Sequence, residues 1–262
     1  MEMDLRGKSA LITGGSKGIG LSTARAFAQE GVSLHLASRT ESDLESARDE
    51  IEADFDVPVA IYPADLSKGE IARQLASDCA EVDILVNNAG GIPGGTLEDI
   101  DEETWRRGWD LKLFGYINMM RAMYTEMKKR GRGVIVNNCG TAGNQKPSLY
   151  AAGISANSAL ITLTRALGGT SLNDGIRVVG INPGDMVNER GVMFLKRQAV
   201  KAFGDEERWR EMMSDLPGGS APSSEDMANA IVFLASPKAR YVSGTVLTID
   251  GGLSGSQAVI GS

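Results

Sequence analysis

Short, continuous runs of apolar residues alternate along this chain with longer stretches in which apolar and charged residues mix. Seven runs rich in β-branched residues predict strands, at residues 10–13, 34–37, 59–62, 84–86, 134–137, 178–181 and 246–249. Runs that are apolar throughout indicate strands covered on both faces, as in a parallel sheet. Strands that alternate with helices are joined by right-handed crossovers, so the pattern predicts an α/β fold with a doubly wound parallel sheet.

The intervening stretches contain recognisable helix starts. Thr40 with Asp43, and Ser67 with Glu70, have the spacing of a capping box, in which a hydroxyl and a carboxylate satisfy each other's backbone amides. No charge-rich linker, low-complexity tract or internal repeat divides the chain. We therefore expect one domain over residues 1–262.

One long stretch, residues 184–224, contains no strand pattern and interleaves large apolar residues with charges. A long insertion that follows a strand, at the end where such sheets bind ligands, is expected to form a helical lid over the substrate. The alternative is a peripheral pair of helices that packs on the surface.

The first predicted strand leads into the glycine-rich segment TGGSKGIG, residues 13–20, which opens a helix. Glycines at these positions allow a tight turn and a close approach to a pyrophosphate, whose charge the helix N-terminus favours. Three glycines alone occur in many strand–helix turns. The strand before them and the helix after them favour a dinucleotide site.

The second predicted strand ends at Ser38 and Arg39. Sites selective for NAD usually place a carboxylate near this point to accept the ribose hydroxyls. Arg39 instead offers a fork to a 2′-phosphate, and Lys17 in the glycine loop adds a second cation. The residues predict NADP(H) over NAD(H), unless Arg39 is one more solvated surface arginine.

Composition restricts the chemistry that is available. The 262 residues are 42% hydrophobic and carry a net charge of −7, with one histidine, His35, and two cysteines, Cys79 and Cys139. Zinc sites and Ser-His-Asp or Cys-His nucleophiles need ligands or bases that this chain scarcely has, so we expect no metal site. The acidic balance argues against nucleic acid and anionic membranes as partners. The lack of a visible signal or spanning segment predicts a soluble cytoplasmic protein.

Several motifs occur together in one order. TGGSKGIG is followed by Asp65-Leu66, by NNAG at residues 87–90, by NPG at 182–184 and by SGTVLTIDGG at 243–252. In this combination the chain resembles the short-chain dehydrogenase/reductase family over essentially its whole length. The resemblance implies a single-domain Rossmann-type sheet of about seven strands, a nicotinamide cofactor, a small carbonyl or alcohol substrate and a homotetramer or homodimer.

The resemblance also implies roles for individual residues. Asp65 would hold the adenine, Asn87 and Gly90 would line the ribose, and Gly184 with Asn188 would lie beside the nicotinamide. The full set of expected cofactor-binding residues is Gly14, Ser16, Lys17, Gly18, Ile19, Gly20, Arg39, Asp65, Leu66, Asn87, Ala89, Gly90, Tyr150, Pro183, Gly184 and Asn188.

The family's active site combines an asparagine, a serine and a Tyr-x-x-x-Lys pair, and here only the tyrosine is retained. Tyr150 precedes a predicted helix, but Ile154 stands where the lysine is expected, and Lys112 stands where the asparagine is expected. Cys139 and Gly140 occupy the two serine positions. Without a neighbouring cation, the pKa of Tyr150 would stay near roughly 10, which suits an acid better than a base at neutral pH.

The gain of Lys112 and the loss of the usual lysine suggest that the ammonium has been relocated toward Tyr150. The alternative is a solvated or snorkelling lysine on a helix surface. Candidates for the serine's role are Asn138, Cys139 and Asn144; of these, Asn144 fits better as a turn residue and Cys139 as a small buried hydrophobe.

Two further features are expected to be structural. His35 alternates with leucines on a predicted strand, and the pair Tyr124 and Lys128 has the right spacing but belongs to a long helix without a serine-bearing strand before it.

The predicted function is an NADP(H)-dependent oxidoreductase that interconverts a carbonyl and a secondary alcohol, with Tyr150 as the proton donor or acceptor. The alternative is a catalytically weak or inactive NADP(H)-binding protein that serves as a sensor or scaffold. Cations in the insertion hint at an amphipathic or anionic substrate or, alternatively, form a solvated helix face: Arg190, Lys196, Arg197 and Lys201.

Overall fold

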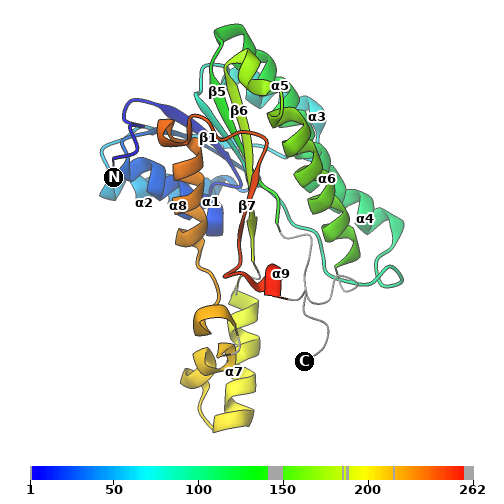
Figure 1. The fold of residues 1–262 in the computed structure, drawn as a ribbon. Helices are drawn as coiled ribbons and strands as arrows, with labels where there is room; N and C mark the ends of the chain where they lie inside the picture. The colour runs from blue at the N-terminus through cyan, green and yellow to red at the C-terminus, as the bar shows by residue number, and fades with distance from the viewer. Residues whose placement is uncertain (1, 141–149, 185, 187–188, 215, 257–262) are drawn as a thin grey trace.

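A seven-stranded parallel sheet forms the centre of the molecule. The computed structural model describes residues 2–140, 150–184, 186, 189–214 and 216–256. The strands are β1 (Ser9–Thr13), β2 (Ser33–Ser38), β3 (Val59–Pro63), β4 (Ile84–Asn87), β5 (Gly133–Asn138), β6 (Ile176–Pro183) and β7 (Val246–Ile249). Their order is β3-β2-β1-β4-β5-β6-β7, and every neighbouring pair is parallel (Figure 1). The predicted Rossmann-type doubly wound sheet is confirmed, and all seven predicted strands are present.

Helices connect the strands and form two outer layers. The α-helices are α1 (Gly18–Gln29), α2 (Glu41–Asp54), α3 (Gly69–Asp78), α4 (Glu102–Trp109), α5 (Gly115–Arg130), α6 (Ala151–Gly168), α7 (Glu189–Phe203), α8 (Ser224–Ala235) and α9 (Leu253–Ser256). The shorter helical segments are η1 (Asp110–Phe114), η3 (Ser171–Asp174), η4 (Glu206–Met213), η5 (Pro217–Gly219) and η6 (Pro237–Ala239).

Each face of the sheet has its own core. Helices α1, α2 and α8 cover one face, where Phe27, Leu44 and Ile231 are fully buried. Helices α3, α5 and α6 cover the other face, where Met119 and Leu160 are fully buried. Burial on both sides explains why the strands are apolar throughout, without the alternation of a half-exposed strand.

The two predicted capping boxes are wrong, because their polar groups bond elsewhere. Thr40 precedes α2 but its side chain makes no capping bond, and the carboxylate of Asp43 pairs instead with Lys17, 2.7 Å away. The Ser67 hydroxyl donates to Asp65 at 2.8 Å, and α3 begins one residue later than that box requires, with Lys68 at the N-cap position. The Lys17–Asp43 pair brings the start of α2 to the glycine-rich loop.

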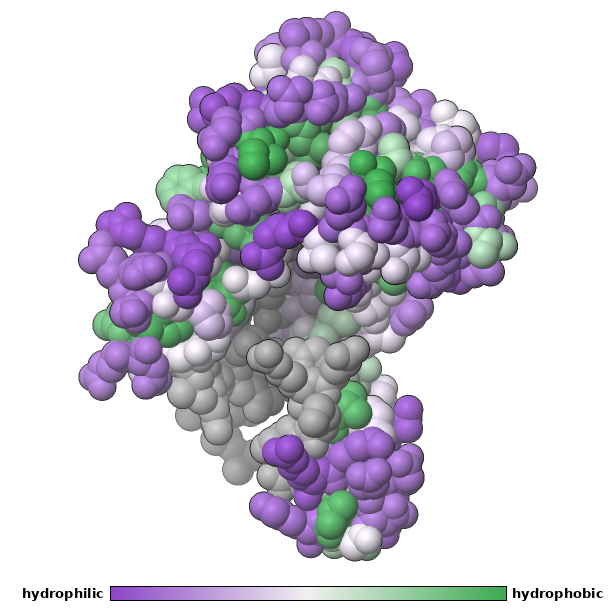
Figure 2. Space-filling model, turned by 180° about the vertical axis from the view of Figure 1, so that it is seen from behind, coloured by the Kyte–Doolittle hydropathy of each residue, from purple (hydrophilic) through white to green (hydrophobic). Residues whose placement is uncertain are grey.

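The insertion between β6 and α8 is helical, as predicted, and its described residues contain no strand. Helix α7 packs mainly against η4, and the two project beyond the carboxyl ends of the strands (Figure 1). Hydrophilic residues cover most of this projection on the face seen from behind (Figure 2). No helix in the described part of the chain is both long enough and apolar enough to cross a membrane.

Candidate active site

A cavity of about 690 Å³ opens where the strand order reverses, between β1 and β4. Crossovers leave β1 toward one face of the sheet and β4 toward the other, so the carboxyl ends of these strands leave a crevice. Residues from the ends of β1, β2, β4 and β5 and from the start of α6 line it. The lining includes three cations and one carboxylate: Lys17, Arg39, Lys112 and Asp43.

The glycine-rich loop forms one wall of this cavity, and its conformation requires residues without a side chain. Gly14 has φ +66°, in the left-handed region. A Cβ on Gly20 would lie 2.0 Å from the carbonyl oxygen of Gly14, so the first turn of α1 packs directly on the loop. Asn88 holds the loop from the opposite side, because its Nδ2 donates to the carbonyl oxygens of Thr13 and Gly14 at 3.1 and 3.2 Å. The wall therefore presents backbone and a helix N-terminus, which fits a phosphate group.

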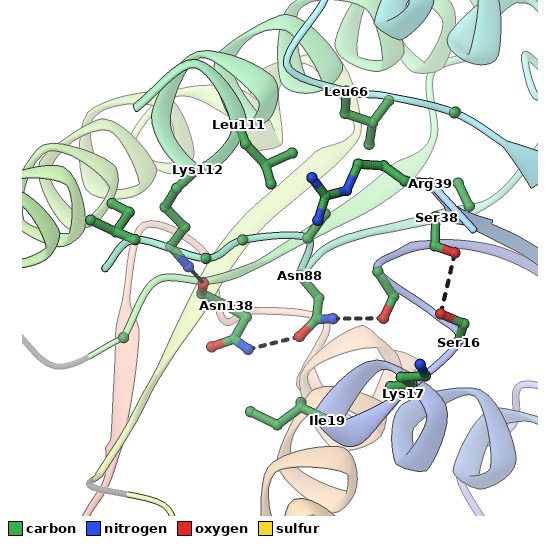
Figure 3. A pocket seen from close by; sticks show the side chains of 18 of the residues that line it. Ser16, Lys17, Ile19, Ser38, Arg39, Leu66, Asn88, Leu111, Lys112 and Asn138 are labelled. Atoms are coloured by element: carbon green, nitrogen blue, oxygen red, sulfur yellow. Dashed lines mark hydrogen bonds between the residues drawn. The ribbon is translucent and has the colours of Figure 1, made fainter. Parts of the chain in front are cut away.

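The end of β2 contributes polar residues to one side of the cavity. The Ser16 hydroxyl donates to that of Ser38 at 3.2 Å, and Arg39 extends its guanidinium into the cavity (Figure 3). Among the described residues Arg39 forms no ion pair. Lys17 is different, because its Nζ is 2.7 Å from the Asp43 carboxylate.

Lys112 enters the cavity from the side opposite Arg39 (Figure 3). It lies in η1, a π-helical turn between α4 and α5 in which the Gly115 amide donates to the Asp110 carbonyl. The lysine stem crosses the backbone of Gly90, where a Cβ would lie 2.6 Å from the lysine Cδ. The glycine after NNA thus makes room for Lys112.

The Lys112 ammonium is held by two oxygens on the cavity wall. Nζ donates to the backbone oxygen of Asn138 at 2.7 Å and to the Tyr116 hydroxyl at 3.2 Å, and it lies 4.7 Å from the centre of the Tyr116 ring. Burial lowers the pKa of Lys112 to about 8, although the side chain keeps a partly accessible face toward the cavity. Lys112 is therefore not a solvated surface lysine. An ammonium has three protons, so with two bound to the wall one remains for a ligand.

Tyr150 lines the same cavity at the start of α6. Its ring lies back over Gly153, where a Cβ would lie 1.9 Å from the ring carbon Cζ. Burial raises the pKa of Tyr150 above its ordinary value, so the phenol is protonated at neutral pH. In the described residues no hydrogen bond joins Tyr150 to Lys112. The two groups line the same cavity without a direct hydrogen bond in the described chain.

The end of β5, with the residue that follows it, carries two of the three candidates for the role of the family's serine, Asn138 and Cys139. Cys139 is fully buried, burial raises the pKa of its thiol, and it is the small hydrophobe that the sequence suggests. The Asn138 amide donates to the side chain of Asn88 at 2.9 Å, so it fixes the loop after β4 (Figure 3). Asn144, the third candidate, lies outside the described residues.

The two features expected to be structural are not part of the lining of this cavity. Tyr124 and Lys128 both bond to Asp174, at 2.7 and 2.9 Å, near the start of β6 and away from the cavity. The His35 ring stacks on Tyr62, and its Nδ1 lies 3.0 Å from the Tyr62 hydroxyl. Burial lowers the pKa of His35.

The structure brings many of the predicted site residues to the cavity. Those that line it are Gly14, Ser16, Lys17, Ile19, Arg39, Leu66, Ala89, Gly90, Lys112 and Tyr150. Gly18 and Gly20 shape the adjoining turn, and Asp65 lies beside Leu66 with its carboxylate bonded to Ser67.

Three of the predicted cofactor contacts, among the residues that the structure describes, have other surroundings. Asn87 is fully buried and donates to Asn137 at 3.0 Å, while its neighbour Asn88 lines the cavity. Pro183 is buried at the end of β6, and Gly184 lines a separate cavity beside Asp250. Asn188 lies outside the described residues.

Sequence reasoning missed Asp43, Asn88 and Gly153 as site residues. A glycine three residues after a candidate tyrosine, on the same helix face, was the one available signal for Gly153. In the described part of the chain, no group of three or more His, Cys, Asp or Glu side chains could hold a metal ion.

Comparison with known proteins identifies the family. The family model described as short chain dehydrogenase matches residues 8–198. The chain belongs to the short-chain dehydrogenase family. A galactitol 2-dehydrogenase (L-tagatose-forming) from Cereibacter sphaeroides is 34% identical over 251 residues, which covers 95% of each chain.

Solved structures of the family have the same architecture. L-sorbose reductase from Gluconobacter frateurii, complexed with NADPH and L-sorbose, superposes with a TM-score of 0.87 at 30% identity, covering 97% of this chain and 99% of its own. An NAD⁺-bound xylitol dehydrogenase gives a TM-score of 0.83 at 25% identity, covering 95% of this chain and all of its own. Relatives of one architecture therefore include both NADPH and NAD⁺ complexes.

Proposed function

We propose that this protein is an NADP(H)-dependent oxidoreductase that interconverts a carbonyl and a secondary alcohol. The observation that carries the proposal is a single cavity with a glycine cradle and Arg39 at one side and Tyr150 with Lys112 at the other. The cradle fits a pyrophosphate, and the cations fit an anionic ligand in a protein whose net charge is −7. A bound nicotinamide would supply or accept the hydride.

Tyr150 is the proposed proton donor or acceptor. Its raised pKa keeps the hydroxyl protonated at neutral pH, which suits protonation of the oxygen formed when a carbonyl is reduced. Lys112 is the proposed source of positive charge, because its ammonium lines the same cavity and retains one proton for a ribose hydroxyl or the substrate oxygen. The ammonium would stabilise negative charge on the phenolate when the reaction runs toward the carbonyl.

The proposed cofactor preference rests on Arg39. Replacement of Arg39 by alanine should weaken NADPH binding about tenfold and change NADH binding less than about twofold, since only NADPH has the 2′-phosphate. Titration calorimetry measures both. Arg48→Ala is the matched control, because Arg48 is a surface arginine of α2 that pairs with Asp49. Equal binding of the two cofactors by the unaltered protein would contradict the preference.

The proposed substrates are small polyhydroxy ketones and their alcohols, as suggested by the names of the sugar- and polyol-converting relatives. The insertion at residues 184–224 is proposed to close over them as a lid of a single domain. Its cations give less support to an anionic substrate, because Lys196 pairs with Glu206 and Glu207 at 3.5 and 3.2 Å.

We further propose that the protein is a cytoplasmic homotetramer or homodimer. Light scattering measures the mass of the assembly in solution and so tests the proposed oligomeric state.

The deciding experiment is NADPH oxidation with a panel of ketoses, other ketones and aldehydes, and NADP⁺ reduction with the corresponding alcohols. Turnover of any member supports the oxidoreductase. Saturable NADPH binding with no turnover across the whole panel would favour the alternative, a cofactor-binding sensor or scaffold. Binding alone does not separate the two, because both need the same cavity.

A further inference from the structure

The cavity contains one carboxylate among its described lining residues, and that carboxylate lies beside a cation predicted to bind phosphate. Asp43 comes from the first turn of α2, and Lys17 from the loop directly before α1. Their ion pair measures 2.7 Å. Lys17 therefore has a directly contacting counter-ion before any ligand arrives, whereas Arg39 forms no ion pair in the described chain and interacts with Asp65 only at longer range.

The Lys17–Asp43 pair is open to water and to ligands. The Lys17 side chain is 72% exposed and the Asp43 side chain 31% exposed. Exposed pairs of this kind are weak, because water and salt screen both charges. A ligand anion of higher charge can displace such a carboxylate, but it must compete with it first.

We propose that Asp43 is a specificity-determining residue that lowers the discrimination of this site between dinucleotides with and without a 2′-phosphate. A 2′-phosphate has to compete with Asp43 for Lys17 and is repelled by the carboxylate nearby. A ribose 2′-hydroxyl faces neither cost. The inference rests on the proposed function only in that the cavity binds a nicotinamide dinucleotide.

The test is binding of two probes to the full chain by titration calorimetry: adenosine 2′,5′-bisphosphate and 5′-AMP. They differ only in the 2′-phosphate. Replacement of Asp43 by asparagine should tighten the bisphosphate about three- to tenfold and change 5′-AMP less than about twofold, as expected for an exposed pair plus relief of one repulsion. In a Lys17→Met background the same replacement should give less than half of that gain.

Asp54→Asn is the matched control, because Asp54 lies on the same helix and pairs with Arg25 at 2.6 Å. It should leave both probes unchanged. An unchanged or weaker affinity of Asp43→Asn for the bisphosphate would overturn the proposal, as would an equal gain in Asp54→Asn or in the Lys17→Met background. Weaker 5′-AMP binding would assign Asp43 to a ribose hydroxyl and also overturn it. Failure of the unaltered protein to bind either probe would instead reject the proposed function.

Discussion

Two tyrosine–lysine pairs of this protein can be compared, and only one of them lines the cavity. Tyr124 and Lys128 have the family's spacing, yet both bond to Asp174 on the surface. Tyr150 and Lys112 are far apart in the sequence, yet both line the cavity at the carboxyl ends of the strands. The spacing of a motif therefore identifies a pair, while the topology of the sheet decides whether the pair can act on a ligand.

The two pairs also differ in charge. Asp174 neutralises Lys128, and burial together with that carboxylate raises the pKa of Tyr124 to about 12. No carboxylate of the described chain pairs with Lys112. A cation without an anion, in a cavity, is available to stabilise charge that forms on a ligand or on Tyr150.

The largest expected effect on turnover comes from removal of the Tyr150 hydroxyl. Tyr150→Phe should lower carbonyl reduction by about 10²- to 10⁴-fold, because the substrate oxygen loses its proton donor. NADPH affinity should fall less than about tenfold, the cost of one hydrogen bond. Steady-state kinetics and calorimetry measure the two quantities. Turnover that survives Tyr150→Phe would break the distinction between the two tyrosines.

Removal of the Lys112 ammonium should have the next largest effect on turnover. Lys112→Met should lower turnover about 10- to 100-fold, as for other groups that stabilise developing charge. In the unaltered protein the rate should fall as pH rises through about 8, where Lys112 loses its proton. The variant should lack that fall. Lys128→Met is the control and should keep both the rate and the pH profile of the unaltered protein.

The same replacement should stabilise the fold. Lys112→Met removes a partly buried charge, and the Asn138 carbonyl keeps the Tyr116 hydroxyl as a donor at 3.1 Å. At neutral pH the gain should be about 1–3 kcal/mol in the free energy of unfolding. The lowered pKa means that the folded state holds the proton less tightly than the unfolded state. The gain in the free energy of unfolding is therefore largest below about pH 8, and it disappears as the pH rises toward the ordinary lysine pKa. Denaturant melts at several pH values measure it, and a destabilised variant at neutral pH would contradict the argument.

The smallest expected effect is that of the surface tyrosine. Tyr124→Phe should cost about 0.5–1.5 kcal/mol in the free energy of unfolding and leave turnover unchanged. Asp174 keeps Lys128 as a partner, so no buried group is orphaned. Parallel melting and kinetic assays with Tyr150→Phe complete the comparison. A loss of activity here would mean that the surface pair also has a catalytic role.

The strands could be predicted because their apolar runs are set by burial on both faces. The glycine-rich turn could be predicted because its glycines are required by backbone contacts, such as the packing of Gly20 on Gly14. Adjacent residues at a strand end point to opposite sides, so the choice between Asn87 and Asn88 depends on the pairing register, which spacing does not specify.

The electrostatic details were not predictable for a different reason. Spacing assigned Asp43 to Thr40, its neighbour in sequence, but Lys17 from another helix start forms the stronger contact. The position of Lys112 followed from the resemblance, whereas its burial depends on the absent side chain of Gly90 and on a helical turn with no sequence signature. Such contacts belong to tertiary structure and are absent from local patterns.

The π-helical turn at η1 also constrains the evolution of this site, because it makes the site sensitive to insertions and deletions. Such a turn is an α-helix with one residue added, and each residue of an α-helix accounts for about 100° of rotation. Deletion of one residue between Asp110 and Phe114 would turn α4 and Trp109 relative to α5 and would break the bond from Trp109 to the Ala152 carbonyl beside Tyr150. The geometry around Lys112 is thus sensitive to chain length as well as to side-chain identity, and homologues that differ there by a single-residue gap would have a differently built active site.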